Sequence, residues 1–234
     1  MTPVIDVFWA NLDAAAATLA PWRAFLDEGE IARAARFRFE RDRNRYIVRH
    51  GILRLLLADR LACAPAALRF AANAYGKPSL VGGGAEFNLS HSHGIALIAF
   101  SRDVALGCDI ELQDARFLAE NIPERLLSPA ELHELRARAP ADQVVAFFDG
   151  WTRKEAYIKA RGLGLSLPLD SFDVSLAPGA RPELHRGCAG WSARSVTPAQ
   201  GFSAAIVAEG ADWQIAAHPL DPASLFAETA AACA

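Results

Sequence analysis

Cysteine is scarce in this sequence, and a long run of apolar residues is missing. The four cysteines are scattered without a CxxC pair, and this spacing argues against a cysteine-built zinc site and against a disulfide framework. No apolar stretch reaches the roughly 18 residues that a transmembrane helix needs. The first nine residues lack a basic segment followed by an apolar one, so we expect no secretory signal. These absences favour a cytoplasmic protein that does not cross a membrane.

An overall basic excess is also missing. The net charge is −3 over 234 residues, which gives no indication of nucleic acid as a partner. The segment 30–60 differs, because it holds nine arginines and no lysine against four acidic residues. A localised cationic patch of this kind favours an anionic ligand of limited size over a long polyanion.

The order of apolar stretches and chain breakers predicts an α+β fold. We expect strands at 4–10, 68–73, 87–90, 95–100, 104–111, 172–176, 191–196, 202–208 and 213–217, and helices at 13–26, 42–61, 141–161 and after Ser128. A long helix followed by several strands thus occurs twice. This order predicts two pseudo-twofold-related halves, 1–111 and 112–234, each with a long helix packed on a small, mainly antiparallel sheet.

The sequence WTRKEAYIKAR reads as the end of a helix that stops at Gly162. On an ideal helix, one sector gathers the large apolar side chains Phe147, Phe148, Trp151 and Ile158. Glu155 and Lys159 lie at the edge of that sector, and Arg153 and Tyr157 lie roughly opposite. An ordinary i,i+4 ion pair, worth about 0.3–0.5 kcal/mol, would explain Glu155 and Lys159. A functional site at the margin of the core is the alternative.

The sequence GCDIE ends a predicted strand. Side chains alternate along a strand, so Asp109 and Glu111 point to one face and Cys108 and Ile110 to the other. The two carboxylates begin about 6.6 Å apart along the chain, close enough to share a cation. Magnesium prefers oxygen ligands, and Glu155 could supply a third. A strand end that emerges into solvent is the alternative interpretation.

The predicted helix at 42–61 carries two arginines on or beside its apolar face. Arg45 falls within the sector of the apolar residues, and Arg49 falls at its margin. An inward arginine needs an anionic partner. That partner is either a protein carboxylate or a phosphate, which the forked donors of arginine suit well.

The sequence FNLSHSH places polar side chains at the end of another strand. His91 and His93 have period-2 spacing, but no third ligand follows from the spacing, so zinc is disfavoured. Ser90 and His91 are either ordinary strand-end residues or donors to phosphate oxygens. Lys77, in the turn YGKP, either contacts phosphate or is solvated. Together with the carboxylates, these residues would fit a metal-assisted transfer on a polyphosphate.

Four motifs in order resemble those of a known family. YGKP, FNLSHS, GCDIE and WTRKEAYIK, followed by GLGLSLPLDSF, are similar to the motifs of the 4′-phosphopantetheinyl transferases of the surfactin-synthetase (Sfp) type. The resemblance covers about 33–208, and the family's pseudo-twofold α+β architecture agrees with the expected duplication. It implies that coenzyme A binds between the two halves. A serine of an acyl or peptidyl carrier protein then attacks its β-phosphate, and 3′,5′-ADP leaves.

The resemblance also implies residue roles. Asp109, Glu111 and Glu155 would hold magnesium or manganese, Glu155 would help to deprotonate the serine, and Lys159 would stabilise charge on the phosphates. The expected contacts to coenzyme A are Arg45, Arg49, Lys77, Ser90, His91, Lys154 and Lys159. Glu30 departs from the pattern, because a basic phosphate contact can occur at that place. We therefore expect the 3′-phosphate to depend more on Arg33, Arg36 or Arg45.

Two other classes of function compete with the transferase. A non-catalytic binder of coenzyme A or of a carrier protein is the main alternative. An arginine-rich RNA-binding module is disfavoured by the inward direction of Arg45 and the lack of exposed aromatic motifs. We expect a monomer, with a carrier protein and coenzyme A as partners and neither nucleic acid nor membrane. The apolar residues Phe117, Leu118, Leu126 and Leu127 would be partner contacts or, more simply, core.

Overall fold

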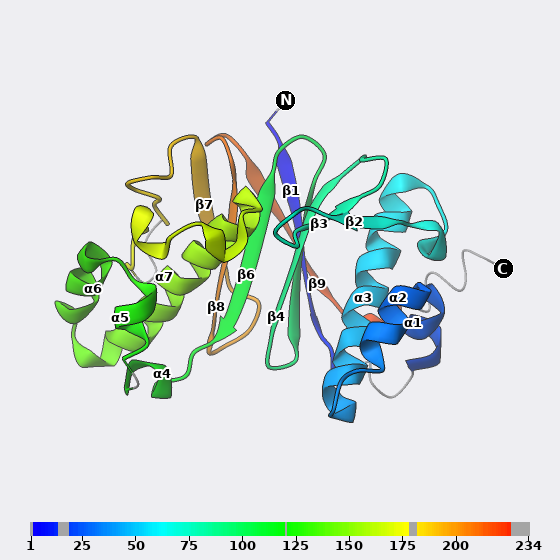
Figure 1. The fold of residues 1–234 in the computed structure, drawn as a ribbon, viewed down its shortest axis with the longest axis horizontal. Helices are drawn as coiled ribbons and strands as arrows, with labels where there is room; N and C mark the ends of the chain where they lie inside the picture. The colour runs from blue at the N-terminus through cyan, green and yellow to red at the C-terminus, as the bar shows by residue number, and fades with distance from the viewer. Residues whose placement is uncertain (1, 14–18, 120, 178–181, 226–234) are drawn as a thin grey trace.

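The computed structural model describes residues 2–13, 19–119, 121–177 and 182–225. Their helices and strands form layers in the order helix, sheet, sheet, helix, with α3 (Glu40–Leu61) and α7 (Pro140–Arg161) on the outer sides (Figure 1). The expected α+β fold class is confirmed. None of the described helices is both long enough and apolar enough to cross a lipid bilayer.

Two sheets form the middle layers. The first has the strand order β4 (Glu86–Ser92), β5 (Ile95–Ser101), β1 (Val4–Asn11) and β9 (Gln214–Leu220); the second has the order β6 (Leu106–Leu112), β8 (Phe202–Glu209) and β7 (Trp191–Val196). Neighbouring strands are antiparallel except β1 and β9, which run parallel. Because β9 returns from late in the chain to β1, strand pairing joins the predicted halves 1–111 and 112–234. That division stays a prediction.

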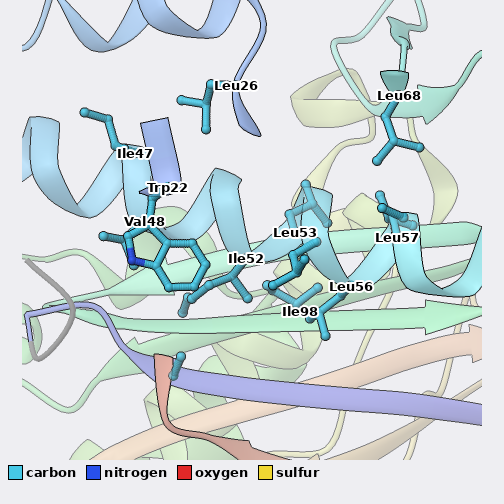
Figure 2. Close-up of a cluster of buried hydrophobic side chains, with 14 of the residues drawn as sticks. Trp22, Leu26, Ile47, Val48, Ile52, Leu53, Leu56, Leu57, Leu68 and Ile98 are labelled. Atoms are coloured by element: carbon cyan, nitrogen blue, oxygen red, sulfur yellow. The ribbon is translucent and has the colours of Figure 1, made fainter. Parts of the chain in front are cut away.

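Three apolar clusters hold the layers together. The apolar face of α3 packs on the first sheet, where Ile52 and Leu56 lie beside Ile98 of β5 (Figure 2). The two sheets bury a second cluster between them, which includes Cys108 and Ile110 of β6. A third cluster lies between α7 and the other face of the second sheet. Burial of apolar area is the main favourable term in folding, so these interfaces determine where each strand and helix lies.

Shorter elements cover the outer edges. The helices are α1 (Leu19–Phe25), α2 (Glu28–Ala34), α4 (Arg116–Ala119), α5 (Pro123–Leu126) and α6 (Pro129–Arg136); 3₁₀ turns lie at Pro65–Ala67, Gly164–Ser166 and Leu169–Ser171; and β2 (Phe70–Ala72) pairs with β3 (Pro78–Leu80). The helix expected after Ser128 is confirmed as α6, and Ser128 and Glu131 form a reciprocal capping box at its start. The expected stop of α7 is confirmed as well, since Gly162 has φ of 63°.

Several local expectations need correction. The helix expected at 42–61 begins at Glu40, its N-cap is Phe39, and no side chain caps that end. The strand expected at 172–176 is a single bridge between Val174 and Leu184. Of the helix expected at 13–26, residues 19–25 are helical, and 14–18 lie outside the described residues. The helix α2 and the strand β3 were not predicted.

The face of α7 that was expected to be exposed is buried. Arg153 and Tyr157 are each 1% exposed. Arg153 donates to the carbonyl and hydroxyl oxygens of Ser175, at 2.5 and 3.2 Å, and the Tyr157 hydroxyl donates to the Gly187 carbonyl at 2.9 Å. The prediction failed because periodicity assumes one buried face, whereas the chain after Gly162 covers the second.

The two sheets meet where β4 runs beside β6. The Asn88 side chain accepts from the Cys108 N–H at 2.9 Å, and the Ser92 hydroxyl accepts from the Leu112 N–H at 3.1 Å. Side chains of β4 thus replace a backbone partner for β6. A Cβ atom on Gly107 would lie 2.2 Å from the Ala156 carbonyl oxygen, so only glycine lets α7 lie this close to β6. These contacts bring the carboxylates of β6, the polar end of β4 and the end of α7 together.

Candidate active site

One carboxylate joins three elements at the centre of the site. Asp109 of β6 is 2% exposed. Its Oδ1 atom accepts from the Ser90 hydroxyl of β4 at 2.7 Å and from the Lys159 ammonium of α7 at 2.6 Å. The same ammonium donates to the Ser90 hydroxyl oxygen at 3.0 Å. Asp109 Oδ2 is buried and has no hydrogen-bond partner among the described residues, so this face of the carboxylate can accept one more positive group.

The ion pair keeps Lys159 charged. Burial disfavours the ammonium form, but the charge of Asp109 and the hydrogen bond to it outweigh burial and raise the pKa of Lys159. The predicted helical pair of Lys159 with Glu155 is therefore not its direct contact, since Asp109 of the sheet holds the ammonium. The surface-pair interpretation fails for Lys159, and a cation fixed beside buried carboxylates remains.

Glu111 lies on the same face of β6 as Asp109. Its Oε2 atom accepts from the Ser92 hydroxyl at 2.9 Å, while Cys108 and Ile110 point into the core. The alternation expected along this strand is thereby confirmed. Burial, followed by the charge of Asp109, raises the pKa of Glu111 to about 7, and Glu155 adds to the effect.

Glu155 brings a third carboxylate from α7. Burial raises its pKa, Lys159 opposes the rise, and Asp109 adds to it. The three carboxylates therefore feel one another's charge. Within the described ranges, however, no three His, Cys, Asp or Glu side chains lie close enough together to form a metal-holding group. The structure brings Asp109 and Lys159 into direct contact and leaves Glu111 and Glu155 as neighbours.

A cationic pocket lies beside this centre, between α3 and the end of β4. It has a volume of about 300 Å³, and its lining includes Arg41, Arg45, Arg49, His91 and His93. Arg45 makes a two-pronged ion pair with Asp13, at 2.7 and 2.5 Å, so a protein carboxylate satisfies it, as one of the two interpretations expected. Arg49 makes no hydrogen bond or ion pair with the described residues and lies over the Tyr46 ring at 4.9 Å.

Arg49 and His91 in the cationic pocket make no ion pair with the described residues, although Asp42 also lines the pocket. Burial lowers the pKa of Arg49 to about 10. Burial also lowers the pKa of His91, and the charges of Arg49 and Lys159 lower it further. Because His91 lies in a field of positive charge and Arg49 makes no ion pair with the described residues, this pocket suits an anion such as phosphate.

A groove opens on the other side of the centre, along the end of α7. Its volume is about 340 Å³, and its lining includes Tyr75, Lys77, Leu89, Glu155, Lys159 and Leu165. Glu155 and Lys159 reach it from α7, while Tyr75 and Lys77 reach it from the turn between β2 and β3. The α7 groove is thus less polar than the cationic pocket and contains one of the three carboxylates.

Comparison with known proteins identifies the family to which the chain belongs. A family model described as the 4′-phosphopantetheinyl transferase superfamily matches residues 105–217. The chain is 34% identical over 207 residues to the 4′-phosphopantetheinyl transferase HetI of Nostoc sp. (strain PCC 7120). The aligned region covers 87% of this chain and 86% of HetI. It is also 30% identical over 171 residues to the 4′-phosphopantetheinyl transferase Sfp of Bacillus subtilis (strain 168). Here the aligned region covers 70% of this chain and 75% of Sfp. This chain belongs to the 4′-phosphopantetheinyl transferase superfamily. The comparisons therefore support the transferase class expected from its motifs.

Lys154 is a predicted site residue whose ammonium is fully engaged by the protein. Its side chain is fully buried and donates to both carboxylate oxygens of Glu131, at 2.8 and 2.7 Å, and to the Phe172 carbonyl at 3.0 Å. An ammonium has three donors, so none is left for a phosphate. The expectation that Lys154 contacts coenzyme A is thus corrected: the residue joins α7 to α6 and to the chain at 172–174.

Ser90 and Lys77 are also engaged by the protein. Ser90 donates its one hydroxyl proton to Asp109 and accepts from Lys159. In this position its hydroxyl has no proton left to donate to a ligand. Lys77 lines the α7 groove, but its ammonium donates to the carbonyls of Leu106 and Ala160, each at 3.0 Å. Burial lowers the pKa of Lys77. Neither contact could be seen in the sequence, because the partners lie 19 to 83 residues away.

The acidic residue that departs from the family pattern has a structural partner. Glu30 accepts from the buried Arg54 at 2.6 Å and lies 3.3 Å from His50. Arg54 lies outside the sector of α3 that holds Arg45 and the apolar residues, yet its side chain is fully buried between Asp27 and Glu30. The spacing of Asp27 and Glu30, which form a capping box, was the available signal for this cluster.

The apolar residues suggested as a partner surface divide between two environments. Leu127 is buried, and Leu118 and Leu126 pack against the cluster under α7. Phe117 is 41% exposed and meets Phe148 edge to face. The core interpretation is therefore confirmed for Leu127, and Phe117 alone of the four is exposed.

Proposed function

We propose that this chain transfers the 4′-phosphopantetheine arm of coenzyme A to a serine of an apo carrier protein and releases 3′,5′-ADP. The observation that carries the proposal is the buried contact of Asp109, Lys159 and Ser90, with Glu111 and Glu155 beside it and the cationic pocket next to it. The family membership supports it independently. Assignment to the surfactin-synthetase type, the pseudo-twofold relation of the halves and a site between them are finer parts of the same proposal.

The arrangement suits phosphoryl transfer because such a reaction needs positioning and charge neutralisation more than a protein nucleophile. Here the attacking hydroxyl belongs to the carrier protein. Lys159 would neutralise charge on the reacting phosphates. Arg49 and His91, which make no ion pair with the described residues, would hold the phosphates in the cationic pocket. Arg45 would join them by exchanging its surface partner Asp13, and Arg33 and Arg36 line a neighbouring cavity that suits the 3′-phosphate.

The oxygen donors of these carboxylates are of the kind that a divalent cation takes, although the three side chains would have to move closer together to share one. Asp109 Oδ2 is buried and has no hydrogen-bond partner among the described residues, and burial, to which the charge of Asp109 adds, raises the pKa values of Glu111 and Glu155. Oxygen donors of this kind are typical of magnesium sites. We therefore propose Asp109, Glu111 and Glu155 as the residues that hold magnesium or manganese. When bound, the ion would neutralise charge on the diphosphate.

Glu155 is the proposed base for the incoming serine. It lines the α7 groove, and burial raises its pKa. A carboxylate whose pKa moves toward neutrality is a better proton acceptor at working pH than an ordinary one. The expected monomeric state and cytoplasmic location stay predictions.

Incubation of the protein with coenzyme A, magnesium and an apo carrier protein tests the proposal. A transferase adds the mass of phosphopantetheine to the carrier and produces 3′,5′-ADP in equal amount, and the carrier with its serine changed to alanine gains nothing. Coenzyme A that binds tightly while a panel of apo carriers from fatty-acid, polyketide and peptide systems stays unmodified would establish the non-catalytic binder instead.

A further inference from the structure

The turn between β2 and β3 is shaped by one asparagine side chain. Asn73 Oδ1 accepts from the N–H groups of Tyr75 and Lys77, each at 2.9 Å. The backbone adds bonds from Asn73 N–H to the Lys77 carbonyl and from Gly76 N–H to the Asn73 carbonyl, each at 3.0 Å, and Gly76 has φ of 87°. Asparagine is suited to such turns because its side chain bonds to the backbone two residues on. The turn therefore presents Asn73 and Lys77 in a fixed relation.

This turn contacts the end of α7. The Asn73 amide nitrogen donates to the Gly162 carbonyl at 2.7 Å, across 89 residues of chain. The Lys77 ammonium donates to the Ala160 carbonyl at 3.0 Å. The last carbonyls of a helix have no partner within the helix, and cationic side chains commonly bond them. The turn thus binds the end of α7 through two side chains, which we call the hairpin clamp (Asn73 and Lys77).

The hairpin clamp also reaches the strand that carries the central carboxylates. The same Lys77 ammonium donates to the carbonyl of Leu106, the first residue of β6, at 3.0 Å. Lys77 therefore joins the start of β6, which leads to Asp109 and Glu111, to the last turn of α7, which follows Lys159 directly. A displacement of that turn would move the Lys159 ammonium from Asp109, which it contacts at 2.6 Å.

We propose that Asn73 and Lys77 are positioning residues, which hold the end of α7 against β6 so that Glu155 and Lys159 face Asp109 and Glu111. The inference rests on the proposed function, because it concerns how the same site is assembled. It differs from the expectation that Lys77 is a ligand contact. Lys77 lines the α7 groove, whereas Asn73 is not among its lining residues; a change at Asn73 therefore tests positioning without removing a ligand contact.

Asn73→Asp is the most selective variant. An aspartate keeps the oxygen that accepts from Tyr75 and Lys77 but lacks the N–H that reaches the Gly162 carbonyl. The turn is kept while its bond to α7 is lost. Lys77→Met removes both carbonyl bonds and keeps a chain of similar length. Ser79→Ala is the matched control, because Ser79 is exposed in the same hairpin and its side chain makes no hydrogen bond with the described residues.

Steady-state kinetics and amide hydrogen exchange give separate readouts. We expect both clamp variants to lower kcat by about ten- to a hundredfold, as small misplacements of reacting groups do, with KM for coenzyme A within about twofold of wild type. Exchange at 158–162 should rise in both variants and not in Ser79→Ala, with little change in the midpoint of thermal unfolding.

The opposite results overturn the proposal. Wild-type kcat in Asn73→Asp would do so, and so would a Lys77→Met variant that changes only KM, since that is the result for a ligand contact. If the wild-type protein modifies no carrier, the proposed function fails instead. Even then, unchanged exchange at 158–162 in both variants would show that the clamp does not hold α7.

Discussion

The two 22-residue helices, α3 and α7, each carry charged side chains that are fully or partly buried. In each helix at least two of these charges are paired with a charge of opposite sign, and one charge at a cavity is not paired with any described residue. In α3, Arg54 is neutralised by Asp27 and Glu30 and Arg45 by Asp13, but Arg49 makes no hydrogen bond or ion pair with the described residues. In α7, Lys154 is neutralised by Glu131 and Lys159 by Asp109, but Glu155 makes no hydrogen bond or ion pair with the described residues.

The exceptions lie at cavities. Arg49 lines the cationic pocket, and Glu155 lines the α7 groove. A buried charge that the protein satisfies is structural, because an unpaired one costs free energy in the folded state. A charge left without its counter-ion at a cavity is a charge that a ligand can satisfy. This difference separates Lys154, which is fully buried, from Arg49, which is partly buried on the other long helix.

The largest expected effect breaks a satisfied pair. Glu131→Gln leaves the Lys154 ammonium buried without its counter-charge, so we expect the free energy of unfolding to fall by about 3–5 kcal/mol. Urea denaturation followed by circular dichroism measures it. The residual folded enzyme should keep its KM for coenzyme A. A stable variant with a raised KM would return Lys154 to the ligand-binding set.

Asp109→Asn should separate activity from stability. The amide keeps the shape of the side chain but loses the negative charge that faces Lys159 and the proposed metal. We expect turnover to fall by at least about a hundredfold, the scale on which loss of a preorganised electrostatic contact acts. Thermal unfolding should change far less than it does in Glu131→Gln. Equal losses of stability and activity would make this carboxylate structural.

Which of these contacts could be predicted from the sequence depends on how far apart the two residues lie along the chain. Alternation along one strand correctly predicted that Asp109 and Glu111 share a face, and helical periodicity placed Glu155 and Lys159 at the edge of the core. Both are local regularities. Glu131 as the partner of Lys154 depends on how α6 packs on α7, and no periodicity along one helix reports that. For the same reason the burial of Arg153 was missed.

Glu111→Gln should stabilise the protein at high pH. A carboxyl whose pKa is raised by folding destabilises the folded state when it ionises, so this penalty grows as pH rises from the ordinary carboxyl range to about 7. We expect the variant to exceed wild type by about 1–2 kcal/mol in free energy of unfolding at pH 8, a value reduced from the full shift because Glu111 is not completely buried. At pH 4 the two should be equal.

Magnesium sharpens the Glu111 measurement. If the ion binds these carboxylates, it should stabilise wild type at pH 8 and stabilise Glu111→Gln much less, since binding to the native state alone adds to stability. Calcium chloride at the same ionic strength tests whether the site prefers the smaller ion. Equal stabilisation of both proteins by magnesium would remove Glu111 from the proposed metal ligands.

The smallest expected effect on stability concerns the unsatisfied cation of α3. Arg49→Met removes a guanidinium that burial already disfavours, as its lowered pKa of about 10 indicates. Its loss should therefore change the free energy of unfolding by less than about 1 kcal/mol, in either direction. Arg54→Met, the matched variant on the same helix, should be far more destabilising because it leaves Asp27 and Glu30 without their partner.

The order of the two variants is reversed for coenzyme A binding. KM for coenzyme A should rise in Arg49→Met and stay near wild type in the fraction of Arg54→Met protein that folds. Since both variants remove the same charge from the same helix, a rise in KM of similar size in both would mean that only the overall charge of α3 matters and that the absence of a counter-ion at Arg49 does not mark a binding residue.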